Sequence, residues 1–175
     1  MEPTPIYIIT LIISVFVIPL ISFFINIALP NNIEKLKAYL STLLLFISTI
    51  LSFMLLMSFF STWSKEMLAF STALKAGIGL NWISLPDLKI SFGILYDRMA
   101  VIMLLVVSLI SLLVHIFSLE YMKGDKRFSR YYAYLGLFTF SMNGIVLSNN
   151  LFFTFVFWEL VGLSSFLLIG FWYEK

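Results

Sequence analysis

One acidic residue lies alone within a long apolar part of this chain. Glu159 is the only charged residue between Arg130 and Glu174, and the 43 residues from Tyr131 to Tyr173 are otherwise uncharged. An ionised carboxylate is costly to place in lipid, and acids found there commonly serve proton or ion transfer. Desolvation makes an isolated carboxyl hold its proton, and an approaching lysine makes it release that proton. The sequence therefore predicts that Glu159 is a proton site in a membrane protein. A structural ion pair with a lysine is the alternative.

Polar residues in the neighbouring apolar runs line up on common helix faces. At about 100° per residue, three serines and the one histidine between residues 99 and 119 fall within an arc of about 80°. Small and hydroxyl residues also mark helix contacts in membranes, so packing is the alternative for the serines, Thr139 and Gly136. An interfacial or capping role is the alternative for His115. The candidate relay or polar-path residues are His115, Asn143, Thr139 and Ser111, and the candidate packing residues are Gly162, Gly136 and Trp158.

The composition excludes most other classes of protein. Hydrophobic residues make up 61% of the chain and charged residues 11%, whereas soluble domains carry about 25% charged residues. A net charge of +2 without a basic cluster argues against nucleic acid as a partner. The chain has no cysteine and one histidine, so we expect no disulfide, no metal site and no redox centre of its own.

Uncharged runs predict the membrane helices, since a bilayer core needs about 20 apolar residues as helix. The last run would be about 65 Å long as a single helix, about twice a bilayer core, so it must fold back. The polar residues Ser148-Asn149-Asn150 are the predicted turn. The predicted fold class is an all-α polytopic membrane protein with about five transmembrane helices. They are expected near Ile6–Leu29, Ala38–Phe60, Met99–Leu119, Tyr131–Leu147 and Leu151–Tyr173.

The segment between the second and third of these helices has a different pattern. Residues 88–96 alternate apolar and other side chains after Pro86-Asp87, which predicts a small hairpin over Trp82–Tyr96 on the outer face. The hairpin either covers helix ends or contacts a neighbouring subunit. The preceding residues, Trp63–Leu80, can form a short helix along the membrane interface.

Basic residues set the predicted orientation. They gather in the first and third loops, which the positive-inside rule places in the cytoplasm, with the amino terminus outside. No basic residue precedes the first helix, so we expect that helix to remain as an anchor and not as a cleaved signal peptide. The loop residues counted are Lys35 and Lys37 in the first loop, and Lys123, Lys126, Arg127 and Arg130 in the third.

Residues 96–175 also carry a specific resemblance. The runs that carry it are EYMKGD at 120–125, FSRYYAYL at 128–135, FTFSM at 138–142 and NLFFTFVFWELVGLSSFLLIGFWY at 150–173. They resemble the antiporter-like membrane subunits, of the subunit L type, of NADH:quinone oxidoreductase, respiratory complex I. In that family the glutamate of the fifth helix is the proton-site acid, and Glu159 matches it. His115 matches a histidine that is common there. Leu160 departs toward the related large subunits of cation/proton antiporters.

The resemblance implies the rest of the expectation. Residues 1–98 would form two transmembrane helices plus the outer loop with its hairpin. Residues 99–175 would form three helices that begin an antiporter-like proton-translocation domain. NADH, FMN, iron–sulfur clusters and quinone would belong to other subunits, so the partners would be other membrane subunits of complex I and the lipid bilayer. The expected location is a bacterial cytoplasmic membrane or a mitochondrial inner membrane.

Family members continue through further helices, including one with the lysine that pairs with this glutamate. Those helices are absent here, so we interpret the chain as an amino-terminal fragment. We expect the side of the fifth helix with Glu159 and Gly162 to be open. The expected function is proton pumping coupled to quinone reduction. An antiporter large subunit and a purely structural membrane subunit are the alternatives.

Overall fold

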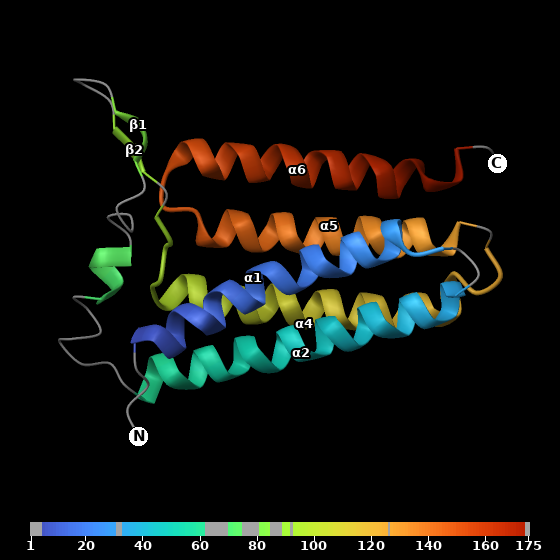
Figure 1. Cartoon of the computed structure of the whole chain (residues 1–175), viewed down its shortest axis with the longest axis horizontal. Coiled ribbons are helices and arrows are strands. Elements are labelled where there is room, and N and C mark those ends of the chain that lie inside the picture. The colour runs from blue at the N-terminus through green and yellow to red at the C-terminus, as the bar shows by residue number, and fades with distance from the viewer. Residues whose placement is uncertain are drawn as a thin grey trace.

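Long helices lying side by side make up most of the molecule (Figure 1). The computed structural model describes residues 5–30, 33–61, 70–74, 81–84, 89–91, 93–125 and 127–173. The helices are α1 (Pro5–Ala28), α2 (Glu34–Ser61), α4 (Arg98–Tyr121), α5 (Phe128–Leu147) and α6 (Leu151–Ile169), the last extended by the 3-10 turn η2 (Gly170–Trp172). Two short strands, β1 (Asn81–Ser84) and β2 (Lys89–Ser91), lie near one end of the bundle.

Helix α5 lies inside the bundle, in contact with α1, α4 and α6. A side-chain carbon added at Gly136 would lie 3.0 Å from the carbonyl oxygen of Pro19 and 3.1 Å from the nitrogen of Phe23, so glycine allows α1 to approach closely. A carbon added at Gly144 would overlap the ring of Phe157 in α6. The two glycines therefore allow neighbours to pack tightly against both sides of α5.

Four helices, α1, α2, α4 and α6, are long and apolar enough to cross a membrane by themselves. Helix α5 does not belong to that group, although it runs beside them over 20 residues. Four of its polar residues, Ser129, Thr139, Ser141 and Asn143, are buried within the protein. The molecule is therefore an all-α polytopic membrane protein, and the least apolar of its long helices is the one its neighbours enclose.

The prediction that Lys35 and Lys37 lie in the first loop was wrong. Helix α2 begins at Glu34, four residues before the predicted start at Ala38, so both lysines are helical. The predicted helix ends were placed where the uncharged runs end, which leaves charged residues outside the helix. Lysine is nevertheless a good helix former, so a helix can begin before such a run. Arg130 lies in the first turn of α5 for the same reason, and not in the third loop.

The predicted hairpin is confirmed, with shorter strands. Strands β1 and β2 pair antiparallel, with an irregularity between Asn81 and Ile83. The alternation was predicted to continue to Tyr96, but β2 ends at Ser91 and Ile94 instead pairs with Ser148. Pro86-Asp87, the predicted turn, lies outside the described residues. Within the predicted interfacial helix, the described residues 70–74 are helical and the rest lies outside the described parts.

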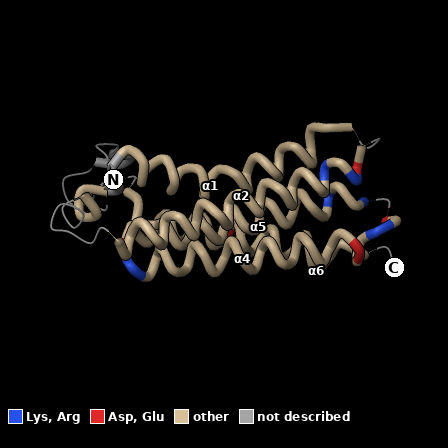
Figure 2. Tube along the Cα trace, turned by 90° about the horizontal axis from the view of Figure 1, so that it is seen from below, with Lys and Arg blue, Asp and Glu red and all other residues tan. Residues whose placement is uncertain are grey.

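Charge is distributed unevenly between the two ends of the bundle. Figure 2 shows most of the described lysines and arginines at the end opposite the amino terminus. The amino end of α2 and the connection between α4 and α5 meet there, and we call this end the basic end. The hairpin lies at the other end. This is the asymmetry that the positive-inside rule uses.

Candidate functional site

Helix α6 carries Glu159, and Asn150 determines where this helix begins. The Oδ1 atom of Asn150 accepts a hydrogen bond from the backbone N–H of Phe153 at 3.0 Å, as an N-cap does. Its Nδ2 atom donates to the carbonyl oxygen of Ser91 at 3.0 Å. One side chain thus caps α6 and attaches it to the hairpin. Glu159 follows Leu151 by eight residues, about 12 Å along the helix, near the middle of a bilayer core of about 30 Å.

The face of α6 around Glu159 is open. Glu159 is exposed, Trp158 is 66% exposed, and a carbon added at Gly162 would meet no atom within 4 Å. Among the described residues, none forms a hydrogen bond or an ion pair with the Glu159 carboxylate. This openness was expected from the sequence. Glu159 and Gly162 are therefore both accessible on the surface that the described residues form.

A second polar group lies between α4 and α5. The Ser111 and Thr139 hydroxyl oxygens are 2.5 Å apart, and the Thr139 hydroxyl also donates to the carbonyl oxygen of Leu135 at 2.9 Å. Because the Thr139 proton is committed to Leu135, Ser111 donates to Thr139. The Nδ1 atom of His115 lies 2.8 Å from the carbonyl oxygen of Ser111. The structure therefore brings three of the four predicted path residues together.

These contacts determine which nitrogen of the His115 ring carries a proton. A carbonyl oxygen only accepts hydrogen bonds, so Nδ1 carries a proton. In the neutral ring Nε2 then has a free lone pair, and it is buried without a partner among the described residues. The Tyr132 hydroxyl donates to the carbonyl oxygen of His115 at 2.8 Å. His115 does not cap α4, which continues to Tyr121.

Asn143, the fourth predicted path residue, points toward α1. Its Nδ2 donates to the carbonyl oxygen of Val15 at 3.1 Å, and its Oδ1 is buried without a partner in the described part of the chain. Asn143 lies one helical turn after Thr139, so the two continue one polar side of α5. Among the described residues, no hydrogen bond joins Glu159 to Asn143 or to the His115 group.

A third polar group, between α1 and α2, was not predicted from the sequence. Lys37 is 1% exposed, and its Nζ donates to the carbonyl oxygen of Asn26 at 3.2 Å. The side chain of Asn26 in turn donates to Ser41 and to the carbonyl oxygen of Ser22. A signal was present: Ser22 and Asn26, and Lys37 and Ser41, are each four residues apart, which is the spacing of one helix face.

The fold and the mid-helix acid define a polytopic α-helical membrane protein with a candidate proton site. Residues 82–132 match the family model described as NADH-ubiquinone oxidoreductase (complex I), chain 5 N-terminus. The chain is 36% identical over 170 residues to NADH-quinone oxidoreductase subunit L of Rickettsia typhi, which is 94% of this chain and 24% of that protein.

Similar matches come from photosynthetic organisms. The chain is 37% identical over 152 residues to the chloroplastic NAD(P)H-quinone oxidoreductase subunit 5 of Chara vulgaris, covering 86% of this chain and 21% of that protein. The equivalent protein of Anthoceros angustus is 47% identical over 95 residues, 54% of this chain and 13% of that protein. The chain belongs to the family of chain 5, or subunit L, membrane proteins of NADH-quinone oxidoreductase. It spans about a quarter or less of the length of these relatives.

Proposed function

We propose that this chain is the amino-terminal part of a proton-translocating membrane subunit of NADH:quinone oxidoreductase. The observation that carries the proposal is Glu159, a lone acid at the middle of α6 in a chain that belongs to this family. Residues 1–98 contribute two membrane helices and the outer hairpin, and residues 99–175 begin the translocation domain. Other subunits of the complex bind NADH, FMN, the iron–sulfur clusters and quinone.

In this proposal Glu159 holds the transferred proton and a lysine elsewhere in the assembled complex controls its release. A carboxyl in a low-dielectric site keeps its proton, and the approach of an ammonium group favours the ionised form. The open face of α6 around Glu159 and Gly162 leaves space for that lysine. An acid with an alternating cationic partner converts movement of charge into uptake and release of a proton.

The polar group between α4 and α5 supplies part of the path. With Nδ1 bonded to Ser111, the free Nε2 of His115 can accept a proton, and Nδ1 can then release one toward Ser111 and Thr139. Asn143 continues this polar side toward α1. Water is needed to join these groups to Glu159, because no hydrogen bond between described residues does so.

Replacing Glu159 tests the proposal directly. In the complete subunit within its complex, Glu159→Gln should abolish most proton uptake by inverted vesicles, because the amide cannot exchange a proton. The other subunits of the complex should still assemble with the variant. Complex abundance on native gels checks assembly. Glu120→Gln is the matched control, since Glu120 is an exposed acid at the end of α4. Unimpaired pumping by Glu159→Gln at normal abundance would assign Glu159 a structural role.

The proposed orientation places the amino terminus outside and the basic end in the cytoplasm. The chain has no cysteine, so single cysteines report position without background. Ser61→Cys at the end of α2 and Lys123→Cys in the connection after α4 should react with impermeant thiol reagents from opposite sides of oriented vesicles. Both sites are exposed in the structure. Reaction of both from one side would contradict the arrangement.

A further inference from the structure

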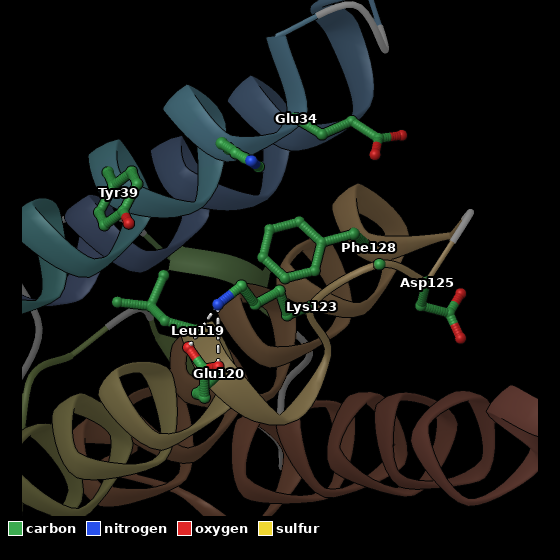
Figure 3. A pocket seen from close by; sticks show the side chains of 9 residues that line it. Glu34, Tyr39, Leu119, Glu120, Lys123, Asp125 and Phe128 are labelled. Carbon is green, nitrogen blue, oxygen red and sulfur yellow. Dashed lines mark hydrogen bonds and ion pairs between the residues drawn. The ribbon is translucent and has the colours of Figure 1, made fainter.

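A pocket of about 430 Å³ opens at the basic end, between the amino end of α2, the carboxyl end of α4 and the connection to α5 (Figure 3). It lies outside the candidate proton site. Its wall combines two ammonium groups and three carboxylates with apolar and aromatic side chains. Helix ends at this position lie at the depth of lipid headgroups, where charged and aromatic residues are favoured.

The charged groups of the pocket are not all compensated within the protein. The Nζ atom of Lys123 lies 2.9 Å from Oε1 of Glu120, and this exposed contact raises the pKa of the Lys123 amine, so the amine stays charged. Lys35 and Glu34 form no hydrogen bond or ion pair with any described residue. In Figure 3 the Asp125 carboxylate points away from the Lys123 side of the pocket. Within the described parts of the chain, Lys35 and Glu34 therefore have no partner that would compete with a ligand.

The apolar part of the pocket continues onto the membrane surface of the bundle. Phe128 and Leu119 form part of its wall, and Tyr39 lies at its edge with 61% of its surface exposed. One turn beyond Tyr39 on α2, Leu43 is 53% exposed, and one turn before Glu120 on α4, Ile116 is 50% exposed. Along both helices, exposed apolar side chains thus follow the charged pocket within one turn, as acyl chains follow the headgroup in a phospholipid.

We propose that this pocket binds the headgroup of a zwitterionic phospholipid with a primary amine. The phosphate lies between the ammonium groups of Lys35 and Lys123, and the lipid ammonium donates to the Glu34 and Glu120 carboxylates. The acyl chains cover Leu43 and Ile116. A choline headgroup has no N–H donor for the carboxylates. A headgroup with net negative charge is disfavoured, because three carboxylates and two ammonium groups line the pocket.

Photoreactive lipids of three headgroups test the proposal in proteoliposomes containing the intact membrane complex. Phosphatidylethanolamine, phosphatidylcholine and phosphatidylglycerol probes are added at equal mole fraction, and labelled peptides are mapped by mass spectrometry. Peptides from residues 34–43 and 116–128 should be labelled about two- to fivefold more by the ethanolamine probe than by the others, as expected for contacts at an exposed charged site. Equal labelling by the three probes, or no labelling because another subunit fills the pocket, would overturn the proposal.

Two variants assign the contacts. Lys35→Gln should reduce labelling by all three probes, because each carries the phosphate. Glu34→Gln should remove the preference for ethanolamine over choline and leave choline labelling unchanged. Arg130→Gln, an exposed cation at the same end but outside the pocket, is the matched control and should change neither. No effect of Lys35→Gln would contradict the phosphate contact.

The source of the headgroup is distinguished by competition. Soluble phosphoethanolamine at millimolar concentration should leave labelling largely unchanged if the acyl chains contribute to binding. Complete loss of labelling would mean that the pocket binds the free phosphate ester and would overturn the assignment to a lipid. Native-gel abundance confirms that each variant, all of them at partly or fully exposed positions, still assembles.

Discussion

Most of helix α5 and all of helix α6 come from one stretch of sequence, residues 131–173, in which Glu159 is the only charged residue, yet the surroundings of the two helices are opposite. In α5, 11 of 20 residues are buried, and they include Thr139, Ser141 and Asn143. In α6 only Ser164 of 19 residues is buried. Helix α5, which is enclosed, lacks the hydropathy of a membrane span, whereas helix α6, which is open, has it. In a membrane, polar side chains are tolerated where protein can bind them, so low hydropathy here marks the interior of the protein.

Glu159 is the exception that this comparison isolates. It is a charged group exposed on the open helix, whereas Thr139, Ser141 and Asn143 of α5 are buried inside the bundle. The Asn143 side chain donates to a carbonyl oxygen of α1, but Glu159 has no such contact with the described residues. Within the described residues, no contact therefore stabilises the Glu159 carboxylate.

The largest effect is expected from a change in the glycines of the two helices. Gly144→Val in α5 should destabilise the protein by about 1–3 kcal/mol, because the new side chain overlaps the ring of Phe157. Gly162→Val in α6 is the matched control, where an added carbon meets nothing within 4 Å, and should change stability by about 0.5 kcal/mol or less. Unfolding of the purified protein in detergent measures both. Equal effects would contradict the assignment of an enclosed and an open helix.

A smaller effect is expected where the hairpin meets α6. Asn150→Ala should cost about 1 kcal/mol, because it removes the cap on the Phe153 N–H and the bond to Ser91. Asn150→Asp keeps the accepting oxygen but not the donor to Ser91, so it should recover most of that loss. The same unfolding measurement applies. If Asp and Ala are equally destabilising, the attachment to the hairpin and not the cap is what holds α6.

Much of this architecture could be predicted because membrane helices obey a strong length and hydropathy rule. The turn at residues 148–150 and the hairpin followed from polar and alternating residues. The amino end of α2 was not predicted, because Lys37 is helical and buried, and its bond to Asn26 depends on the approach of α1. Helical spacing grouped Ser111 with His115, but the contact from Ser111 to Thr139 joins two helices whose rotation no single sequence determines.

The site itself was predicted less completely than the fold. The sequence identified Glu159 by its isolation, and it identified the polar residues by their spacing. It could not show that His115, Ser111 and Thr139 form one group while Asn143 points to α1. No hydrogen bond among the described residues links these groups to Glu159, so the fold does not join the two parts of the candidate site.

The smallest expected effect is the proton flux of this chain alone. Among the described residues, Glu159 has no cationic partner and no hydrogen bond to the His115 group. An acid can bind a proton by itself. Without a cationic partner that moves toward it and away from it, however, nothing drives the release of that proton. Purified chain in liposomes with an internal pH dye should therefore show the flux of empty liposomes under an imposed potential. Glu159→Gln should then make no difference. A flux well above the background and lost in Glu159→Gln would show that the chain carries protons by itself, and that the open face of α6 needs no partner.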